Sequence, residues 1–458
     1  MTPWVQQKLS YAEILTELYS TFKPKGLRYG GFYIFTKPLL VLFDLDLIKA
    51  VLIKDFDYFM NRGTYVNLEK DPLTGNLFSL GDDKWKNLRT KLTPTFTSGK
   101  IKIMFSTVNS CALDLVTLVD EIVEKCQPMR IEDVMSRYTT DVIGSCAFGI
   151  DCNSLHQPDS EFIKYKKKVT EPAPLQALKF LLFMLLPEVL EFFNTNFFDN
   201  DTIEFYRRIV KETVEHRKIN GVRRNDFLQL LIDLQSNAED SKENGLTMDE
   251  ITAQVFIFFT ASYETTSTAL SFCLYELSLQ QQLQEKARQE ITEVLNKHNG
   301  QCTYDALAEL TYLEQCIYES LRKYHPLTYL SRVCKETYRV PGTDLVLEKG
   351  TNVIIPAFAI QRDPEIFPDP LHYNPERFSA ETKAQLHTCA WLPFGEGPRF
   401  CIGLRFGMMK TKLALMHLLR NFKFSVNEKT IVPVQVNKLS IILSSDKGIW
   451  LNAEKILN

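Results

Sequence analysis

The residues with the clearest chemical potential in this 458-residue chain lie between Phe394 and Gly403, in the sequence FGEGPRFCIG. Two glycines and a proline favour a tight loop that brings backbone N–H groups close to one sulfur, that of Cys401. These N–H groups and the dipole of the following helix favour the thiolate. A lone thiolate suits a metal whose cofactor supplies the other ligands, as haem does, and Arg399 can pair with a haem carboxylate. The alternative is a buried structural cysteine, the commonest fate of a free cysteine.

A second candidate site lies inside a long predicted helix, at about residues 246–279. This segment lacks Pro and Gly, and Thr247 and Glu250 can form a capping box at its start. A polar cluster at residues 262–267 interrupts its apolar pattern, and burying such groups costs free energy unless they find partners. Ala261 and Thr265 lie four residues apart, so the Thr265 hydroxyl can bond the Ala261 carbonyl and open a polar notch. The alternative is simple back-bonding of a threonine within a helix.

The other patterns predict a mainly α fold with a small β region, in one large domain covering residues 1–458. No repeat or linker divides the chain. Residues 83–310 are mostly helical in pattern, and further helices are expected at 312–324 and 404–421. Strand-like runs occupy 32–35, 39–43, 345–347 and 352–355. Residues 236–245 suggest a loop, and the alternation near 438–442 suggests a last hairpin.

Composition excludes several classes of protein. Lys and Arg total 53 against 56 acidic residues, a net charge of −3, which argues against nucleic acid as a partner. Ten cysteines without C-x-x-C or H-E-x-x-H spacing argue against a disulfide scaffold and a zinc site, and favour a reducing, cytosol-facing environment. No signal peptide or membrane span is visible. The longest purely apolar run, Phe180–Leu186, indicates either a buried helix or a segment that dips into a membrane surface.

On these motifs the chain resembles the cytochrome P-450 family of haem-thiolate monooxygenases, from about residue 20 onward. Residues 394–403 match its haem-binding cysteine signature, F-x-x-G-x-R-x-C-x-G, at every defined position. The stretches LTPTFTSGK (92–100) and NDFL (225–228) look closest to the microsomal members that insects use on foreign compounds. The resemblance implies a single haem domain, with haem b as cofactor and Cys401 as the axial ligand of its iron.

The resemblance also implies roles for other residues. Those expected to bind the cofactor with Cys401 are Phe394, Gly395, Arg399, Gly403, Trp85, Arg89 and Arg332. Glu319 and Arg322 match the family's E-x-x-R pair, and Arg377 is expected to join them in a buried structural triad. A solvated surface charge is the alternative for Arg89 and for Arg332, and a surface helix pair is the alternative for Glu319 and Arg322.

The family's oxygen-binding helix pattern, A/G-G-x-D/E-T-T, matches from Ala261 to Thr266. Ala261, Glu264 and Thr265 are therefore the expected catalytic residues. They would deliver protons to dioxygen, with Glu264 as the relay to solvent. Ser262 stands where the family usually has glycine, which narrows the expected notch.

The implied activity is insertion of one atom of O2 into apolar small molecules, either xenobiotics or endogenous lipids and hormones. The chain has no G-x-G-x-x-G fingerprint, so electrons from NADPH are expected through a separate flavoprotein reductase, with cytochrome b5 as a further donor. The expected reductase dock comprises Lys84, Lys86, Lys91, Arg405 and Lys410; scattered solvated lysines are the alternative. Two alternative hypotheses for the function are a haem-thiolate isomerase or dehydratase and a non-enzymatic haem-binding paralogue.

The expected location is the cytosolic face of the endoplasmic reticulum membrane. Microsomal members begin with a membrane helix, and we expect that anchor to be absent from these residues, leaving a peripheral association. The variable segments near 65–80, 180–198 and 256–261 are expected to form the substrate pocket. Their aromatic residues indicate only that the ligand is apolar.

Overall fold

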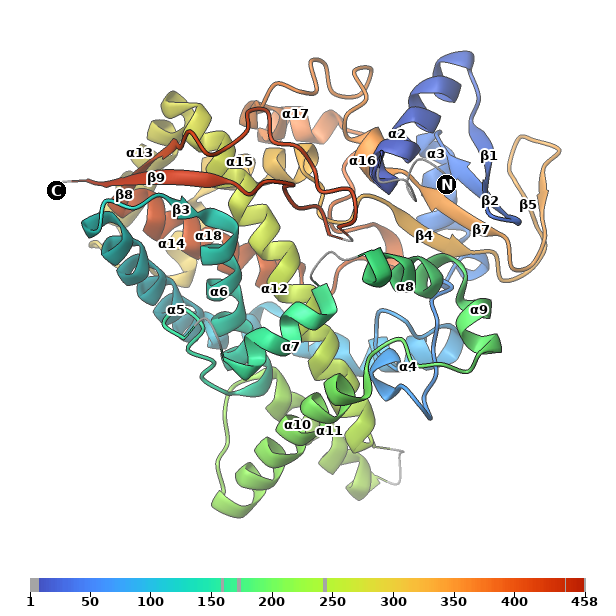
Figure 1. The fold of residues 1–458 in the computed structure, drawn as a ribbon, viewed down its shortest axis with the longest axis horizontal. Coiled ribbons are helices and arrows are strands. Elements are labelled where there is room, and N and C mark those ends of the chain that lie inside the picture. Colours follow the sequence, from blue (N-terminus) through green and yellow to red (C-terminus); the bar gives the residue numbers. More distant parts are fainter. Residues whose placement is uncertain (1–7, 158–159, 171–173, 242–244, 441, 457–458) are drawn as a thin grey trace.

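The computed structural model describes residues 8–157, 160–170, 174–241, 245–440 and 442–456, and it confirms a mainly α fold with a small β region (Figure 1). The helices are α2 (Tyr11–Phe22), α3 (Leu45–Lys49), α4 (Asp82–Leu92), α5 (Ser98–Glu124), α6 (Ile131–Ile143), α7 (Glu161–Thr170), α8 (Pro174–Leu185), α9 (Pro187–Phe192), α10 (Asn200–Asn220), α11 (Phe227–Ser241), α12 (Met248–Leu279), α13 (Gln281–Lys297), α14 (Tyr304–Glu309), α15 (Thr311–Lys323), α16 (Ala357–Ile360), α17 (Ala380–Gln385) and α18 (Leu404–Asn421).

The strands form small sheets at the edge of the helical body. They are β1 (Tyr29–Ile34), β2 (Lys37–Leu42), β3 (Met129–Arg130), β4 (Leu330–Val333), β5 (Tyr338–Arg339), β6 (Val346–Leu347), β7 (Asn352–Ile355), β8 (Phe422–Val426) and β9 (Trp450–Lys455). One sheet has the order β1-β2-β7-β4, in which β2 and β7 run parallel with Leu40 opposite Val353. A second has the order β3-β9-β8, and β5 pairs with β6. The strand runs predicted before residue 360 are confirmed with small shifts.

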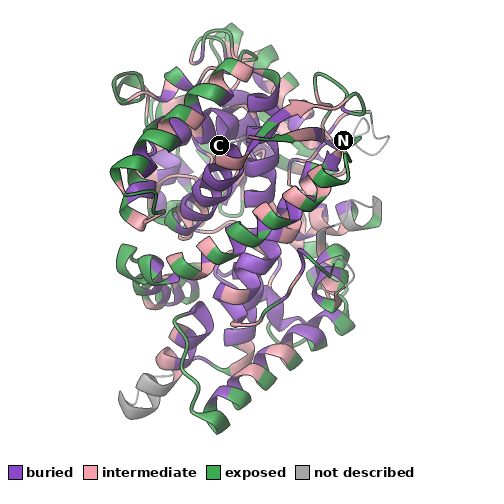
Figure 2. Cartoon of the chain, turned by 90° about the vertical axis from the view of Figure 1, so that its left-hand side faces the viewer, coloured by how far each residue is buried: buried purple, intermediate pink, exposed green. Residues whose placement is uncertain are grey.

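Helix α12 crosses the middle of the molecule and carries the polar segment of interest (Figure 1). Its predicted capping box is present: the Thr247 hydroxyl accepts from the Glu250 amide at 3.2 Å, and the Glu250 carboxylate accepts from the Thr247 amide at 2.8 Å. Buried residues fill the interior around it, while exposed residues cover the outer helices (Figure 2). A helix apolar on nearly all sides is stable only when other elements surround it, here α6, α10, α15 and α18.

Of two further local predictions, one is wrong and one is confirmed. The loop expected at 236–245 is helical as far as Ser241, where α11 ends; residues 242–244 lie outside the described part. The hairpin expected near 438–442 is present as a short antiparallel pairing: Val436 bridges Ser445, the Asn437 amide donates to the Ser444 carbonyl at 2.9 Å, and Lys438 and Leu439 lie in the turn. Residue 441 is also outside the described part. A longer antiparallel pair at this end of the chain is β8 with β9.

Among the described residues, α5 is long and apolar enough to cross a membrane by length and composition. It packs against α18 and α6 in the core, where Ile101, Leu115 and Val119 are fully buried. The run Phe180–Leu186 forms the end of α8 and the residue after it. Phe183, Met184 and Leu185 are buried, which favours the buried-helix reading over insertion of this run into a membrane.

Candidate active site

The loop before α18 places one sulfur at the floor of a large cavity. Gly395 and Gly397 have left-handed backbone angles, with φ of 69° and 73°. A side chain at Gly397 would begin 1.9 Å from the Leu52 carbonyl oxygen, so only glycine fits there. The Cys401 amide donates to the Phe394 carbonyl at 2.8 Å, which closes the loop. The Cys401 side chain is surrounded by protein but exposed to the cavity.

Burial raises the pKa of the Cys401 thiol. The Gly403 amide and the cations Arg89, Arg62 and Lys410 act in the opposite direction, but desolvation outweighs them. The Gly403 amide therefore favours the thiolate, as expected of a backbone N–H group at this site, although burial outweighs its effect. A metal ion binding the sulfur displaces this proton.

The cavity above Cys401 encloses about 2270 Å³, its open mouth included. The three segments expected to form the substrate pocket all reach it, through residues such as Leu77, Phe183, Phe198, Phe256 and Ile257. Apolar and aromatic side chains thus make up most of its wall. This shape and chemistry suit a flat apolar cofactor with an apolar ligand beside it.

Four arginines line one side of this cavity: Arg62, Arg89, Arg332 and Arg399. The Arg399 guanidinium stacks on Trp85 at 4.4 Å and donates to the Leu80 carbonyl, while its Nε and Nη1 atoms have no hydrogen-bond partner. Arg332 donates to the Ser331 carbonyl at 2.8 Å, and its Nε atom is unpartnered.

Arg62 donates to the Phe78 carbonyl at 3.0 Å, and Arg89 donates to the Phe400 carbonyl, also at 3.0 Å. Within the described residues, none of the four arginines forms an ion pair with a carboxylate.

No carboxylate ion pair among the described residues offsets the positive charge of these arginines. Burial, followed by repulsion from Arg62, Arg332 and Arg89, lowers the pKa of Arg399 to about 7. Burial also lowers the pKa of Arg62 to about 9 and that of Arg332 to about 10. Buried cations usually have anionic partners, so this side of the cavity suits a ligand bearing carboxylates. Haem has two propionates, and the residues present fit it.

Helix α12 supplies the polar notch that the sequence predicts in the otherwise apolar wall of the cavity. The Thr265 hydroxyl donates to the Ala261 carbonyl at 2.7 Å, as the spacing predicts. Ala261, Ser262, Glu264 and Thr265 all line the cavity that contains Cys401. The notch and the sulfur therefore face one space.

Glu264 interacts electrostatically with Lys166, a buried lysine of α7. Burial raises the pKa of Glu264 to about 8, and Lys166 opposes this rise. Burial lowers the pKa of Lys166 to about 8. The Lys166 ammonium also donates to Ser136 at 2.7 Å and to Thr140 at 3.3 Å. Two groups with such similar pKa values can both gain and lose protons near neutral pH.

Glu319 and Arg322 are fully buried in α15, so the surface-pair alternative is excluded. Arg322 donates to both Glu319 oxygens at 2.7 and 2.8 Å and to the Gln361 carbonyl at 2.8 Å. Arg377 lies 3.4 Å from Glu319 and donates to the Asp369 carbonyl at 2.9 Å. The three side chains meet outside the cavity, where they connect α15 to the segment before the cysteine loop.

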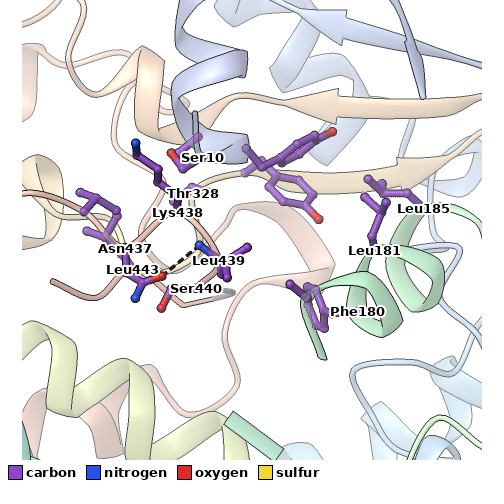
Figure 3. A pocket seen from close by; sticks show the side chains of 15 residues that line it. Ser10, Phe180, Leu181, Leu185, Thr328, Asn437, Lys438, Leu439, Ser440 and Leu443 are labelled. Carbon is purple, nitrogen blue, oxygen red and sulfur yellow. Dashed lines mark hydrogen bonds between the residues drawn. The ribbon is translucent and has the colours of Figure 1, made fainter. Parts of the chain in front are cut away.

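A second, smaller cavity lies between α2, α8 and the loop around residues 436–443, and encloses about 600 Å³ with its mouth (Figure 3). Its wall combines Leu181, Leu185 and Leu439 with the polar Thr328 and Asn437. Phe180 lines both cavities, so its ring forms part of the wall between them.

A mainly α-helical domain with a cysteine sulfur beneath an apolar cavity, and unpaired arginines beside it, defines the class of haem-thiolate proteins. A family model described as Cytochrome P450 matches residues 2–452. Probable cytochrome P450 6a14 of Drosophila melanogaster is 40% identical over 99% of this chain and 91% of its own length. Probable cytochrome P450 6a23 (42%; 100% and 91%) and Cytochrome P450 6a9 (41%; 99% and 90%) of the same organism are similar. The chain therefore belongs to the cytochrome P450 family of monooxygenases.

Sequence reasoning missed Arg62 and the partners of two buried lysines, Lys166 and Lys410. No local pattern marks these residues, since they come from segments distant in sequence. Placing Lys410 on the reductase dock is wrong, because its side chain is fully buried and bonds Ser262. Lys84, Lys86 and Arg405 are exposed and Lys91 is half-buried, so these four remain candidates.

Proposed function

We propose that this P450 inserts one oxygen atom of O2 into apolar small molecules, either xenobiotics or endogenous lipids and hormones, with electrons from NADPH. The observation that supports this most is that Cys401 and the Ala261–Thr265 notch face one apolar cavity. An isomerase or dehydratase has no use for a proton-delivering notch, and a haem carrier needs neither the notch nor the half-buried Glu264.

The residues that would hold haem b are Cys401 as the iron ligand and the arginines as partners for its propionates. Trp85 would hold Arg399 in place by stacking. When bound, the haem activates dioxygen with electrons supplied from outside, aided by electron donation from the thiolate.

The chain's own contribution to the reaction is proton delivery. The Thr265 hydroxyl, bonded to the Ala261 carbonyl, presents its oxygen to the cavity, where it can orient a water molecule. Glu264 and Lys166 pass protons toward this notch from the side of α7. Glu319, Arg322 and Arg377 act on structure only.

The electron donor is a separate NADPH-dependent flavoprotein reductase, with cytochrome b5 as a further donor. Its dock is the surface formed by Lys84, Lys86, Lys91 and Arg405, on α4 and the start of α18. Exposed charges are screened by salt, so turnover should slow as ionic strength rises.

The protein acts at the cytosolic face of the endoplasmic reticulum, in contact with the membrane surface. An apolar face supports this location. We use that term for the exposed residues Tyr33, Phe35, Val189, Phe192 and Phe193. The β1–β2 hairpin and α9 are neighbours in the fold, as the ion pair between Lys37 and Glu188 at 2.5 Å shows.

The test is the absorption spectrum of the reduced carbon monoxide complex, together with NADPH consumption in the presence of reductase. The purified protein should show the red-shifted band of a thiolate ligand, and Cys401→Ser should abolish it. Survival of that band in Cys401→Ser would refute the ligand assignment. Substrate turnover that needs neither reductase nor NADPH would favour the isomerase or dehydratase.

A further inference from the structure

Lys410 is a fully buried lysine of α18, the helix that follows the cysteine loop. Its ammonium donates to both the backbone carbonyl and the hydroxyl of Ser262 on α12. Ser262 directly follows Ala261, whose carbonyl accepts the Thr265 hydroxyl. One side chain therefore joins the helix after Cys401 to the polar notch across the cavity.

The groups around this ammonium leave its charge without a carboxylate. The Phe406 ring centre lies 5.4 Å away, and the thiols of Cys146 and Cys401 are its electrostatic neighbours. Within the described residues no acidic side chain forms an ion pair with Lys410. Lys412, two residues later on the same helix, differs in this respect, since its ammonium lies 2.7 Å from Glu314.

A buried cation bonded only to neutral oxygens costs free energy unless a negative charge lies within reach. Burial lowers the pKa of Lys410 to about 7, and negative charge on Cys401 acts in the opposite direction. Metal coordination keeps Cys401 deprotonated, so it supplies that negative charge. The Ser262 hydroxyl is the second oxygen that holds the ammonium, and glycine at this position would lack it.

We propose that Lys410 is a positioning residue for oxygen activation: held by Ser262, its positive charge favours reduction of the haem iron, and its bonds fix α12 beside Thr265. This inference rests on the proposed function. The electron comes from the flavoprotein reductase, and the step is the one-electron reduction of ferric to ferrous iron. Positive charge near a redox centre stabilises its reduced form, and more strongly in a medium of low dielectric constant.

The test compares haem-loaded wild type with Lys410→Met, Lys410→Arg and Lys410→Gln in redox titrations with mediator dyes. Lys410→Met should shift the midpoint potential to more negative values. Lys410→Arg keeps the positive charge, so most of this shift should be absent from it. Lys410→Gln keeps a donor for Ser262 without the charge, so it should also shift the potential negatively. If Lys410→Met does not fold, the Gln and Arg variants give the same comparison. Lys412→Met is the matched control and should leave the potential unchanged.

The second readout is the share of NADPH oxidation that ends as hydrogen peroxide. Lys410→Met should raise this share, because α12 loses its bonds to α18 beside Thr265. Ser262→Gly should raise it less, since the carbonyl bond remains. A midpoint potential equal to wild type in both Lys410→Met and Lys410→Gln would overturn the inference. An equal shift in Lys412→Met would also overturn it.

The carbon monoxide spectrum of the wild type separates the two proposals. A thiolate band in the wild type with no effect at Lys410 defeats this inference alone. No thiolate band in the wild type defeats the proposed function, and this inference with it.

Discussion

At the scale of single residues, the arginine group beside the cavity is the main electrostatic feature. Arg62, Arg332 and Arg399 are placed by carbonyl bonds and stacking, and each has a lowered pKa because burial is not offset by a carboxylate. Buried arginines without carboxylate partners lower the free energy of unfolding of the protein when no ligand is bound. Binding of an anion to these arginines raises the free energy of unfolding again.

This argument predicts opposite effects of one substitution on the free chain and on cofactor retention. Arg399→Met should raise the free energy of unfolding of the haem-free protein by about 1–3 kcal/mol, because it removes a buried cation whose Nε and Nη1 atoms have no hydrogen-bond partner. It should also speed haem loss to a scavenging apoprotein. Urea unfolding and transfer kinetics measure the two effects. Arg405→Met, at an exposed position, should change neither; a less stable haem-free Arg399→Met would contradict the argument.

At the scale of elements, buried hydrogen bonds connect the end of α15 to the segment that leads into the cysteine loop. The Gln361 side chain accepts from the Leu392 amide at 2.7 Å and donates to the Arg322 carbonyl at 3.0 Å. His325, just after α15, is fully buried, and its Nε2 atom bonds the Leu392 carbonyl at 3.0 Å. The position of the loop thus depends on α15, which the Glu319–Arg322 pair keeps in place.

His325 predicts a dependence of stability on pH. Burial lowers its pKa to about 4, whereas an unfolded histidine has a pKa of about 6.5. Below pH 6.5 the unfolded chain binds a proton that the folded chain does not, so stability falls as the pH drops toward 4, by up to about 3 kcal/mol. His417, whose pKa burial also lowers to about 4, adds to this loss.

Urea unfolding at pH 5 and pH 7 measures the effect. His325→Asn, which does not titrate, should reduce the difference between the two pH values. His372→Asn, at an exposed position, should leave that difference as in the wild type. A His325→Asn protein with the full wild-type difference would contradict the assignment.

At the scale of the whole molecule, the apolar face gathers exposed aromatic residues from two distant parts of the chain. Phe192 and Phe193 are 84% and 70% exposed on and after α9, and Phe35 is 61% exposed between β1 and β2. Apolar side chains grouped on a surface usually mark a contact with another surface. Phe180 and Phe183 on α8, next to α9, line the main cavity, so the proposed membrane contact lies close to the cavity wall.

Replacing two of these rings should therefore weaken membrane binding without affecting the haem site. Phe192→Ser with Phe193→Ser should lower partitioning onto phosphatidylcholine–phosphatidylserine vesicles roughly a hundredfold or more, since each buried ring contributes about 1.5–3 kcal/mol. Vesicle flotation measures this, and the carbon monoxide spectrum should stay unchanged. Ile219→Ser, an equally exposed site at the far end of α10, is the control. Equal partitioning of the double variant and the wild type would remove this face from the membrane contact.

Local chemistry was readable from the amino-acid sequence wherever the partners are close along the chain. The capping box at Thr247, the bounds of α18 and the Thr265–Ala261 bond each depend on residues within a few positions of one another. The mainly α class follows from the same periodicity. The signature around Cys401 was equally legible because its glycines and cysteine share one loop.

Contacts between segments far apart along the chain required the folded structure. Arg62 joins Arg399 only because the residues before α4 fold against the cysteine loop. Lys410 is a buried partner of Ser262, not a surface charge, because α18 packs on α12, 148 residues away. The short hairpin around residue 440 is bonded to a distant segment through the Leu443 amide and the Pro326 carbonyl. Burial and electrostatic repulsion depend on distances in space, which a linear pattern does not contain.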